Sequence, residues 1–274
     1  MKVLILDCMR KKFTQTLLQD ILINRQNLSL AYILGTQDIK QRYKRSALGA
    51  MWLTINMTVM IAAMGFVFGR IFNTPLHDFF PYLAAGIILW GFISTVLSEG
   101  CMTFIDSEAM IKQLPLPYFT FILRLMWRNL LILSHNIVIL PFILWAVGRN
   151  FHIEALLVVP GLVILLINLM WIALILATLC ARYRDMPQII QSIIQVIFYV
   201  TPVMWMRQTL TGDAGKLMIE SNPLFHLIDI VRAPILGEMP SMLSYTVTTL
   251  MAVIGWMVAI QFYRQYKHKI AYWV

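Results

Sequence analysis

The chain has few charged residues and few cysteines for its length. Only 13% of its 274 residues are charged and 59% are hydrophobic, whereas about 25% charged residues is typical of a soluble domain. Its three cysteines are widely spaced, and an odd, scattered set argues against a disulfide framework or a cysteine-based metal site. The sequence therefore excludes a disulfide-rich secreted fold. It also has too much apolar surface for one soluble core.

Motifs for ATP binding and catalysis are also missing. The stretch nearest to a phosphate loop, Thr211–Leu217, has the wrong spacing for G-x-x-x-x-G-K-[ST] and no preceding strand. Asp106-Ser107-Glu108 stands alone and favours an N-terminal helix cap over an acidic metal motif. The five histidines have no partner at ligand spacing. We expect no catalytic residue, metal or cofactor in this chain, so any ATP hydrolysis must take place on another chain.

Long apolar runs separated by proline and glycine indicate an all-α polytopic membrane protein. A transmembrane helix needs about 20 apolar residues. Six segments approach this length: 51–69, 82–105, 125–147, 155–180, 189–206 and 243–263. We expect a six-helix transmembrane domain over 51–263, a cytoplasmic N-terminal region over 1–50 and a cytoplasmic tail over 264–274.

Lysine and arginine predict the orientation of these spans. Seventeen of the 22 fall on the side that holds both termini, which the positive-inside rule assigns to the cytoplasm. The net charge of +9 does not indicate nucleic acid, because the cations cluster at the ends of apolar runs. Anionic membrane lipids are the better partners for such cations.

The N-terminal region has two features next to the first span. Apolar positions at helical spacing over 13–45 predict an amphipathic helix in the cytoplasmic membrane interface. At its end, four cations lie within six residues, more than orientation alone requires. They are Lys40, Arg42, Lys44 and Arg45.

Aromatic residues are abundant, whereas ionisable residues inside the spans are few. Glu99, late in the second span, is expected to pair with a nearby cation, and no proton path is evident, which argues against an ion-coupled carrier. Aromatic faces could form a surface along which sugar rings slide, although lipid-facing bulk explains any one of them alone. The candidate channel-lining residues are Trp52, Phe66, Trp90, Phe92, Phe198 and Tyr199.

Four stretches in order carry a family resemblance: Asp38–Trp52, Ile111–Leu131, Arg182–Trp205 and Asn222–Gly237. Together they resemble the membrane subunit of ABC-2 type polysaccharide exporters, especially O-antigen export permeases of the Wzm kind. One departure is Gln37, where many relatives have arginine.

The resemblance implies a homodimeric channel in the bacterial inner membrane, joined by two copies of an ATPase subunit that binds ATP and Mg²⁺. It implies an undecaprenyl-diphosphate-linked polysaccharide as substrate, with the diphosphate bound by the four cations. Gly65 and Gly69 offer a small-residue face for dimerisation or for packing within one subunit. The alternatives are an exporter of capsule, teichoic acid or a small lipid or drug, and, less favoured, a membrane enzyme acting on lipid-linked sugars.

Two connections are expected to have special roles in such an exporter. Residues 106–117 outline a short helix closed by prolines that would couple the ATPase to the membrane helices. Its candidate residues are Asp106, Glu108, Ile111, Lys112, Leu114, Pro115 and Pro117.

The external connection over 207–242 is predicted to fold into re-entrant gate helices, because it is long and apolar. Asp229 and Arg232 are three residues apart and able to pair there. The candidate gate residues are Asn222, Pro223, His226, Asp229 and Arg232.

Overall fold

The protein is an all-α polytopic membrane protein. The computed structural model describes residues 25–44, 46, 48–49, 51–72, 74–114, 116–149, 153–207 and 212–274. Five of the described helical segments are long and apolar enough to cross a membrane. They are α3 (Met51–Ile71), α4 (Leu76–Met102), α6 (Phe119–Ile137) continued by α7 (Ile139–Ala146), the short 3-10 turn η1 (Ile153–Leu157) continued by α8 (Val158–Arg182), and α12 (Met242–Trp273).

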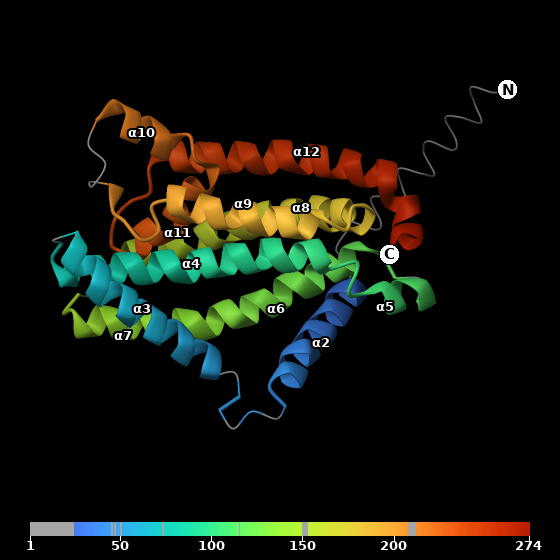
Figure 1. Cartoon of the computed structure of the whole chain (residues 1–274), viewed down its shortest axis with the longest axis horizontal. Coiled ribbons are helices and arrows are strands. Elements are labelled where there is room, and N and C mark those ends of the chain that lie inside the picture. Colours follow the sequence, from blue (N-terminus) through green and yellow to red (C-terminus); the bar gives the residue numbers. More distant parts are fainter. Residues whose placement is uncertain are drawn as a thin grey trace.

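The long helices run side by side along the molecule, and Figure 1 shows which connections lie at each end. The α3–α4 connection and the short helix α10 (Asp213–Glu220) lie at one end, which we call the α10 end. The short helix α5 (Glu108–Gln113) and the C-terminus lie at the other, which we call the α5 end.

The fifth and sixth predicted spans differ from the helices that form there. The segment predicted as the fifth span forms α9 (Met186–Val200), which has only 15 residues. It ends there because Thr201 precedes Pro202 and adopts the extended backbone that a following proline favours. By contrast, α12 continues as far as Trp273, through the predicted tail, because no proline interrupts it.

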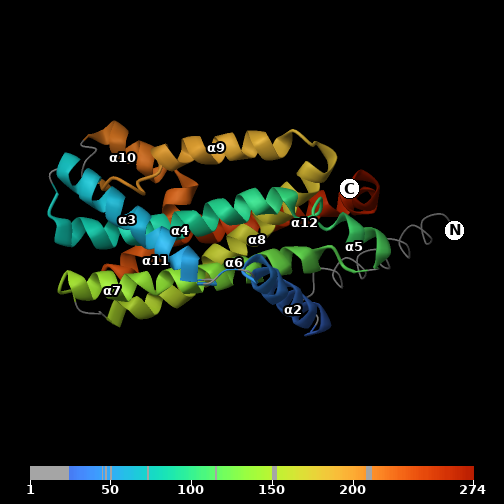
Figure 2. The same cartoon turned by 60° about the horizontal axis from the view of Figure 1, so that its bottom comes forward.

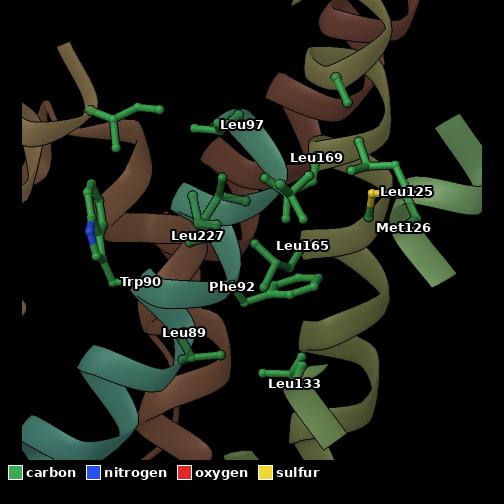
Figure 3. Close-up of a cluster of buried hydrophobic side chains, with 14 of the residues drawn as sticks. Leu89, Trp90, Phe92, Leu97, Leu125, Met126, Leu133, Leu165, Leu169 and Leu227 are labelled. Atoms are coloured by element: carbon green, nitrogen blue, oxygen red, sulfur yellow. The ribbon is translucent and has the colours of Figure 1, made fainter. Parts of the chain in front are cut away.

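Helix α4 lies at the centre of the bundle and is buried along most of its length. In the turned view of Figure 2 it runs between α9 and α6, both of which it contacts. Leucines and aromatic residues of α4 meet side chains of α6, α8 and α11 (Pro223–Ile235) in the apolar core (Figure 3). This packing holds α4 as the fixed element against which the candidate sites are built.

The glycines predicted as a dimerisation face pack inside the subunit. A Cβ atom on Gly65 would overlap the ring of Phe80, and one on Gly69 would overlap the side chain of Leu76. Phe80 and Leu76 both belong to α4. These two glycines therefore let α3 approach α4, and they give no support to a dimer contact.

Helix α2 (Arg25–Arg42) packs obliquely on α6. Its small residues Ala31 and Gly35 are buried, and the backbone of Gly35 lies close to Arg124 and Trp127. Three apolar residues of the predicted interface helix, Leu28, Tyr32 and Ile33, are exposed, where a bilayer interface would cover them. The first part of the predicted interface helix, residues 13–24, lies outside the described residues.

Candidate functional site

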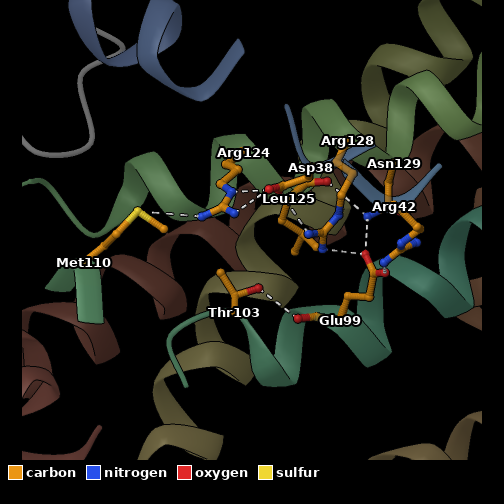
Figure 4. A network of polar contacts seen from close by, with 9 residues as sticks. All are labelled: Asp38, Arg42, Glu99, Thr103, Met110, Arg124, Leu125, Arg128 and Asn129. Carbon is orange, nitrogen blue, oxygen red and sulfur yellow. Dashed lines mark hydrogen bonds and ion pairs between the residues drawn. The ribbon is translucent and has the colours of Figure 1, made fainter. Parts of the chain in front are cut away.

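A cluster of three arginines and two carboxylates joins α2, α4 and α6 near the α5 end (Figure 4). Asp38 of α2 accepts two hydrogen bonds from Arg124, at 2.7 Å from Nε and 2.5 Å from Nη2. Arg128 bridges the two carboxylates, at 3.3 Å from Asp38 and 2.7 Å from Glu99. Arg42 reaches the other oxygen of Glu99 at 3.3 Å. We call these five residues the arginine cluster.

The arginine cluster carries more positive than negative charge. Three guanidinium groups face two carboxylates, and the Nε of Arg128 is buried without a hydrogen-bond partner among the described residues. Arg42 makes one long contact and its side chain is 48% exposed. A cluster of this kind can accept a further anion, because charge-assisted bonds to phosphate oxygens are short and strong.

The four predicted cations have different surroundings. Arg42 belongs to the arginine cluster, where it pairs with Glu99, which confirms the expected partner for that carboxylate. Lys40 and Lys44 are exposed at the end of α2 and make no ion pair with a described residue. Arg45 lies outside the described residues. Binding of a diphosphate by these four residues stays a prediction.

The sequence interpretation missed Asp38, Arg124 and Arg128 as a unit. Arg124 and Arg128 are four residues apart on α6, so they lie on one face of that helix. Asp38 is 86 residues away from Arg124 in the chain. Only the spacing of the two arginines could have signalled the cluster, because no local pattern reveals its carboxylates.

An apolar pocket of about 330 Å³ lies between α2, α6 and α8, beside the arginine cluster. The rings of Tyr32 and Trp127 meet there, with centroids 4.9 Å apart, and the indole NH of Trp127 donates to Thr36. The other residues of this pocket are Leu28, Ala31, Leu123, Met126, Leu130, Leu166 and Met170. A cationic surface and an apolar pocket therefore both lie along α2.

The predicted channel aromatics do not form one surface within a single subunit. Trp52 and Phe66 are exposed on α3, and Tyr199 is exposed on α9. Trp90 and Phe92 are buried on α4 instead.

Two of the buried or partly buried aromatics have ring contacts that fix them in place. The ring of Trp90 lies 5.4 Å from that of Phe198, and Phe198 in turn lies 5.5 Å from Tyr199. The channel-lining role of all six aromatics stays a prediction.

The predicted coupling segment contains α5, which is held against the C-terminus. Lys112 donates to Glu108 at 2.6 Å and to the main-chain oxygen of Val274 at 2.9 Å. The hydrogen bond from Lys112 lowers the pKa of Glu108. Ile111 is buried, whereas Leu114 is exposed at the tip.

The remaining coupling residues occupy the rim of this segment. Asp106 is exposed, Pro117 is half-buried, and Pro115 lies outside the described residues. The exposed residues of the segment offer a surface to a partner, and the coupling role stays a prediction.

The predicted gate segment contains a buried helix, α11, and an exposed one, α10. Asn222 caps α11 by accepting from the backbone of Leu224 and Phe225, and Pro223 occupies its first turn. His226 contacts Ser244 at 2.9 Å and the carbonyl of Glu220 at 2.8 Å. These bonds anchor α11 to α10 and α12.

Asp229 and Arg232, which the sequence spacing would allow to pair, do not pair with each other. Asp229 accepts a hydrogen bond from Ser244 at 2.8 Å. Arg232 donates to the carbonyl of Pro202 at 2.7 Å and lies 4.1 Å above the ring of Tyr82. Both residues are buried, so partners from other helices replace the local pair that a solvated helix would form.

Polar clusters thus lie near both ends of a bundle whose long apolar helices could cross a membrane. Residues 29–236 match the ABC-2 type transporter family, and the chain belongs to this family. It is a transmembrane subunit of an ABC transporter.

Its relatives include permeases of O-antigen export. The chain is similar to the O-antigen export system permease protein RfbA of Myxococcus xanthus, at 23% identity over 214 residues, which cover 76% of this chain and 80% of that protein. It is also similar to two proteins of the same name from Klebsiella pneumoniae. One is 23% identical over 84% of this chain and 88% of its own length, and the other is 24% identical over 73% and 77%.

Proposed function

We propose that this chain is the membrane subunit of an exporter of undecaprenyl-diphosphate-linked polysaccharide, of the O-antigen kind, in the bacterial inner membrane. Two copies form the channel, and two copies of a separate ATPase subunit bind ATP and Mg²⁺ and drive transport. The chain itself catalyses no reaction.

The observation that carries this proposal is the arginine cluster beside the apolar pocket of α2. A polyprenyl diphosphate has two parts, a doubly anionic head and a long apolar tail. The exposed part of Arg42, with Lys40 and Lys44, suits the head. The pocket formed by α2, α6 and α8 suits a stretch of the tail. The names of the relatives support a glycan as the rest of the substrate.

The orientation follows from the same residues. The α5 end holds the C-terminus and lies near the arginine cluster. The sequence assigns seventeen of the 22 lysines and arginines to the side of the termini, and the positive-inside rule supports a cytoplasmic location for that side. The carrier therefore enters from the cytoplasmic leaflet, where α5 also meets the ATPase. The gate helices α10 and α11 then face the external side.

Reconstitution tests this proposal directly. The chain and its ATPase partner are placed together in proteoliposomes that contain the lipid-linked polysaccharide, and glycan outside the vesicles is measured with a lectin. We expect glycan to appear only with ATP. Hydrolysis that moves lipid or drug but no lipid-linked glycan would contradict the proposal and favour another cargo for the same fold.

A further inference from the structure

A second cavity, of about 240 Å³, lies between α3, α4 and α6 and is not part of the apolar pocket. Most of its lining is apolar, and one wall includes the buried ring of Phe92. Four polar side chains also line it: Asn56, Thr95, Asn129 and Asn136. The volume is several times the roughly 30 Å³ that one water occupies in the liquid, so the cavity has room for a sugar ring.

Asn136 is buried in this cavity without a partner. Its side chain belongs to a residue that is 6% exposed, and its Oδ1 is enclosed without a hydrogen bond to any described residue. By contrast, the buried Asn129 and Asn168 both donate to carbonyl oxygens of their own helices. A polar group buried at membrane depth is costly unless it has a hydrogen-bond partner. Because Asn136 also lines the cavity, a rotation of its side chain would turn this unpaired amide toward a ligand there.

Asn129 connects this cavity to the arginine cluster. It lines the cavity and donates to Glu99 at 2.9 Å, and Glu99 also pairs with Arg42. Figure 4 shows Asn129 beside Glu99 and Arg42. Asn136 lies seven residues further along α6, which is about 10 Å along a helix axis. The unpaired amide therefore lies about as far from Asn129 as the far side of a sugar lies from the diphosphate that carries it.

We propose that this cavity binds the sugar attached directly to the carrier's diphosphate. A hydroxyl or acetamido group of that sugar bonds to the amide of Asn136, and the apolar face of its ring packs on Phe92. The inference rests on the proposed function and adds to it a site that distinguishes a glycosylated carrier from a bare one. Water alone, or a second copy of the chain, is the competing occupant.

The test compares two ligands and three proteins in nanodiscs. The ligands are undecaprenyl diphosphate and the same carrier bearing one N-acetylglucosamine, and their binding is measured by native mass spectrometry. The proteins are the unaltered chain, Asn136→Leu and the control Ile132→Val, which changes an apolar residue of the same cavity. Asn136→Ala serves as a second variant should the leucine prevent folding.

We expect the unaltered chain to prefer the glycosylated carrier by about fivefold to tenfold, the scale of one or two net hydrogen bonds. Asn136→Leu and Asn136→Ala should abolish this preference without weakening the bare carrier. Ile132→Val should keep it. The preference itself, together with its loss in the Asn136 variants, is the result that supports the site.

Three outcomes overturn the inference. Equal binding of both carriers by the unaltered chain would mean that the cavity holds water and no sugar. The proposed function would survive this result, because the bare carrier still binds. A preference that persists in both Asn136 variants places the sugar elsewhere. Loss of the dimer mass in those variants would assign Asn136 to the subunit contact instead. Binding of neither carrier would contradict the proposed function itself.

Discussion

Asp38 is the residue that ties α2 to the rest of the protein. It is the one acceptor that Arg124 and Arg128 share in the arginine cluster, and its side chain is 16% exposed. The side chains of Arg124 and Arg128 are 19% and 20% exposed. They need a carboxylate close by, because an unpaired charge in such a place is strongly destabilising. The negative charge of Asp38 therefore contributes to the position of α2, together with the Arg42–Glu99 pair and the hydrogen bond from Trp127 to Thr36.

Asp38→Asn should loosen α2 from α6. The variant keeps the size of the side chain and removes its charge, and we expect a loss of about 1–3 kcal/mol in the free energy of unfolding. Thermal denaturation in detergent measures this loss, and hydrogen exchange of residues 25–42 reports where it acts. Asp213→Asn, at an exposed position on α10, is the control and should change neither. Equal effects of the two substitutions would contradict the role of Asp38.

Arg42 and Arg45 allow orientation to be separated from ligand binding. Replacing both with lysine keeps the positive charge that orients the first span. Lysine lacks the planar fork that grips two phosphate oxygens at once. We therefore expect insertion, dimerisation and basal ATP hydrolysis to stay normal while export of lipid-linked glycan falls. Normal export by the double variant would leave orientation as the whole role of these cations.

At the scale of elements, α11 is fixed by the backbone of α8. A Cβ atom on Gly161 of α8 would overlap the carbonyl oxygen of Ile230 in α11. A main-chain atom within a helix cannot rotate away as a side chain can. The two helices reach this distance only because residue 161 has no side chain, and the closeness helps to bury α11 between α4, α8 and α12.

Gly161→Ala should displace α11. Overpacking of this kind costs about 1–3 kcal/mol, and we expect faster hydrogen exchange over residues 223–235 than in the unaltered chain. Gly100→Ala is the matched control, because its nearest neighbour would lie 3.4 Å away, in ordinary contact. In the unaltered chain, residues 223–235 should exchange more slowly than the exposed α10. Rapid exchange there before any substitution would contradict a fixed gate helix.

Apolar runs, together with the prolines and glycines that interrupt them, made most of the helices predictable. Side-chain contacts between residues distant in the chain were not predictable. The start of α11 follows from Asn222 and Pro223, a cap and a first-turn proline, which are local signals. Pro202 explains the end of α9 at Val200, but the span predicted over 189–206 ran past this local signal. Arg232, however, uses Pro202 and Tyr82, and these lie 30 or more residues away. A spacing rule for solvated helices therefore failed at a buried one.

At the scale of the whole molecule, α5 is connected to three of the long helices. The segment before α5 leaves α4, the central helix, and the segment after it enters α6. Lys112 also ties α5 to the end of α12. A push on α5 would thus reach three of the long helices together. The α5 segment has the connections that a coupling element needs, and this is the reason to test it.

Leu114 allows that test without damage to the fold. Its side chain is 49% exposed at the tip of the segment, whereas Ile111 is 9% exposed and packs inside. Aspartate at position 111 would therefore unfold the segment and would not test a contact with a partner. Leu114→Asp removes one apolar contact from a docking surface and places a charge there. We expect a stable protein that assembles weakly with the ATPase, so that hydrolysis continues while export falls severalfold. Copurification of the two subunits, hydrolysis and export are measured on the same sample.

Leu217→Asp, at an exposed leucine of α10 on the opposite end, is the control and should leave all three unchanged. Unchanged assembly and export in Leu114→Asp would move the coupling contact to another part of the α5 end.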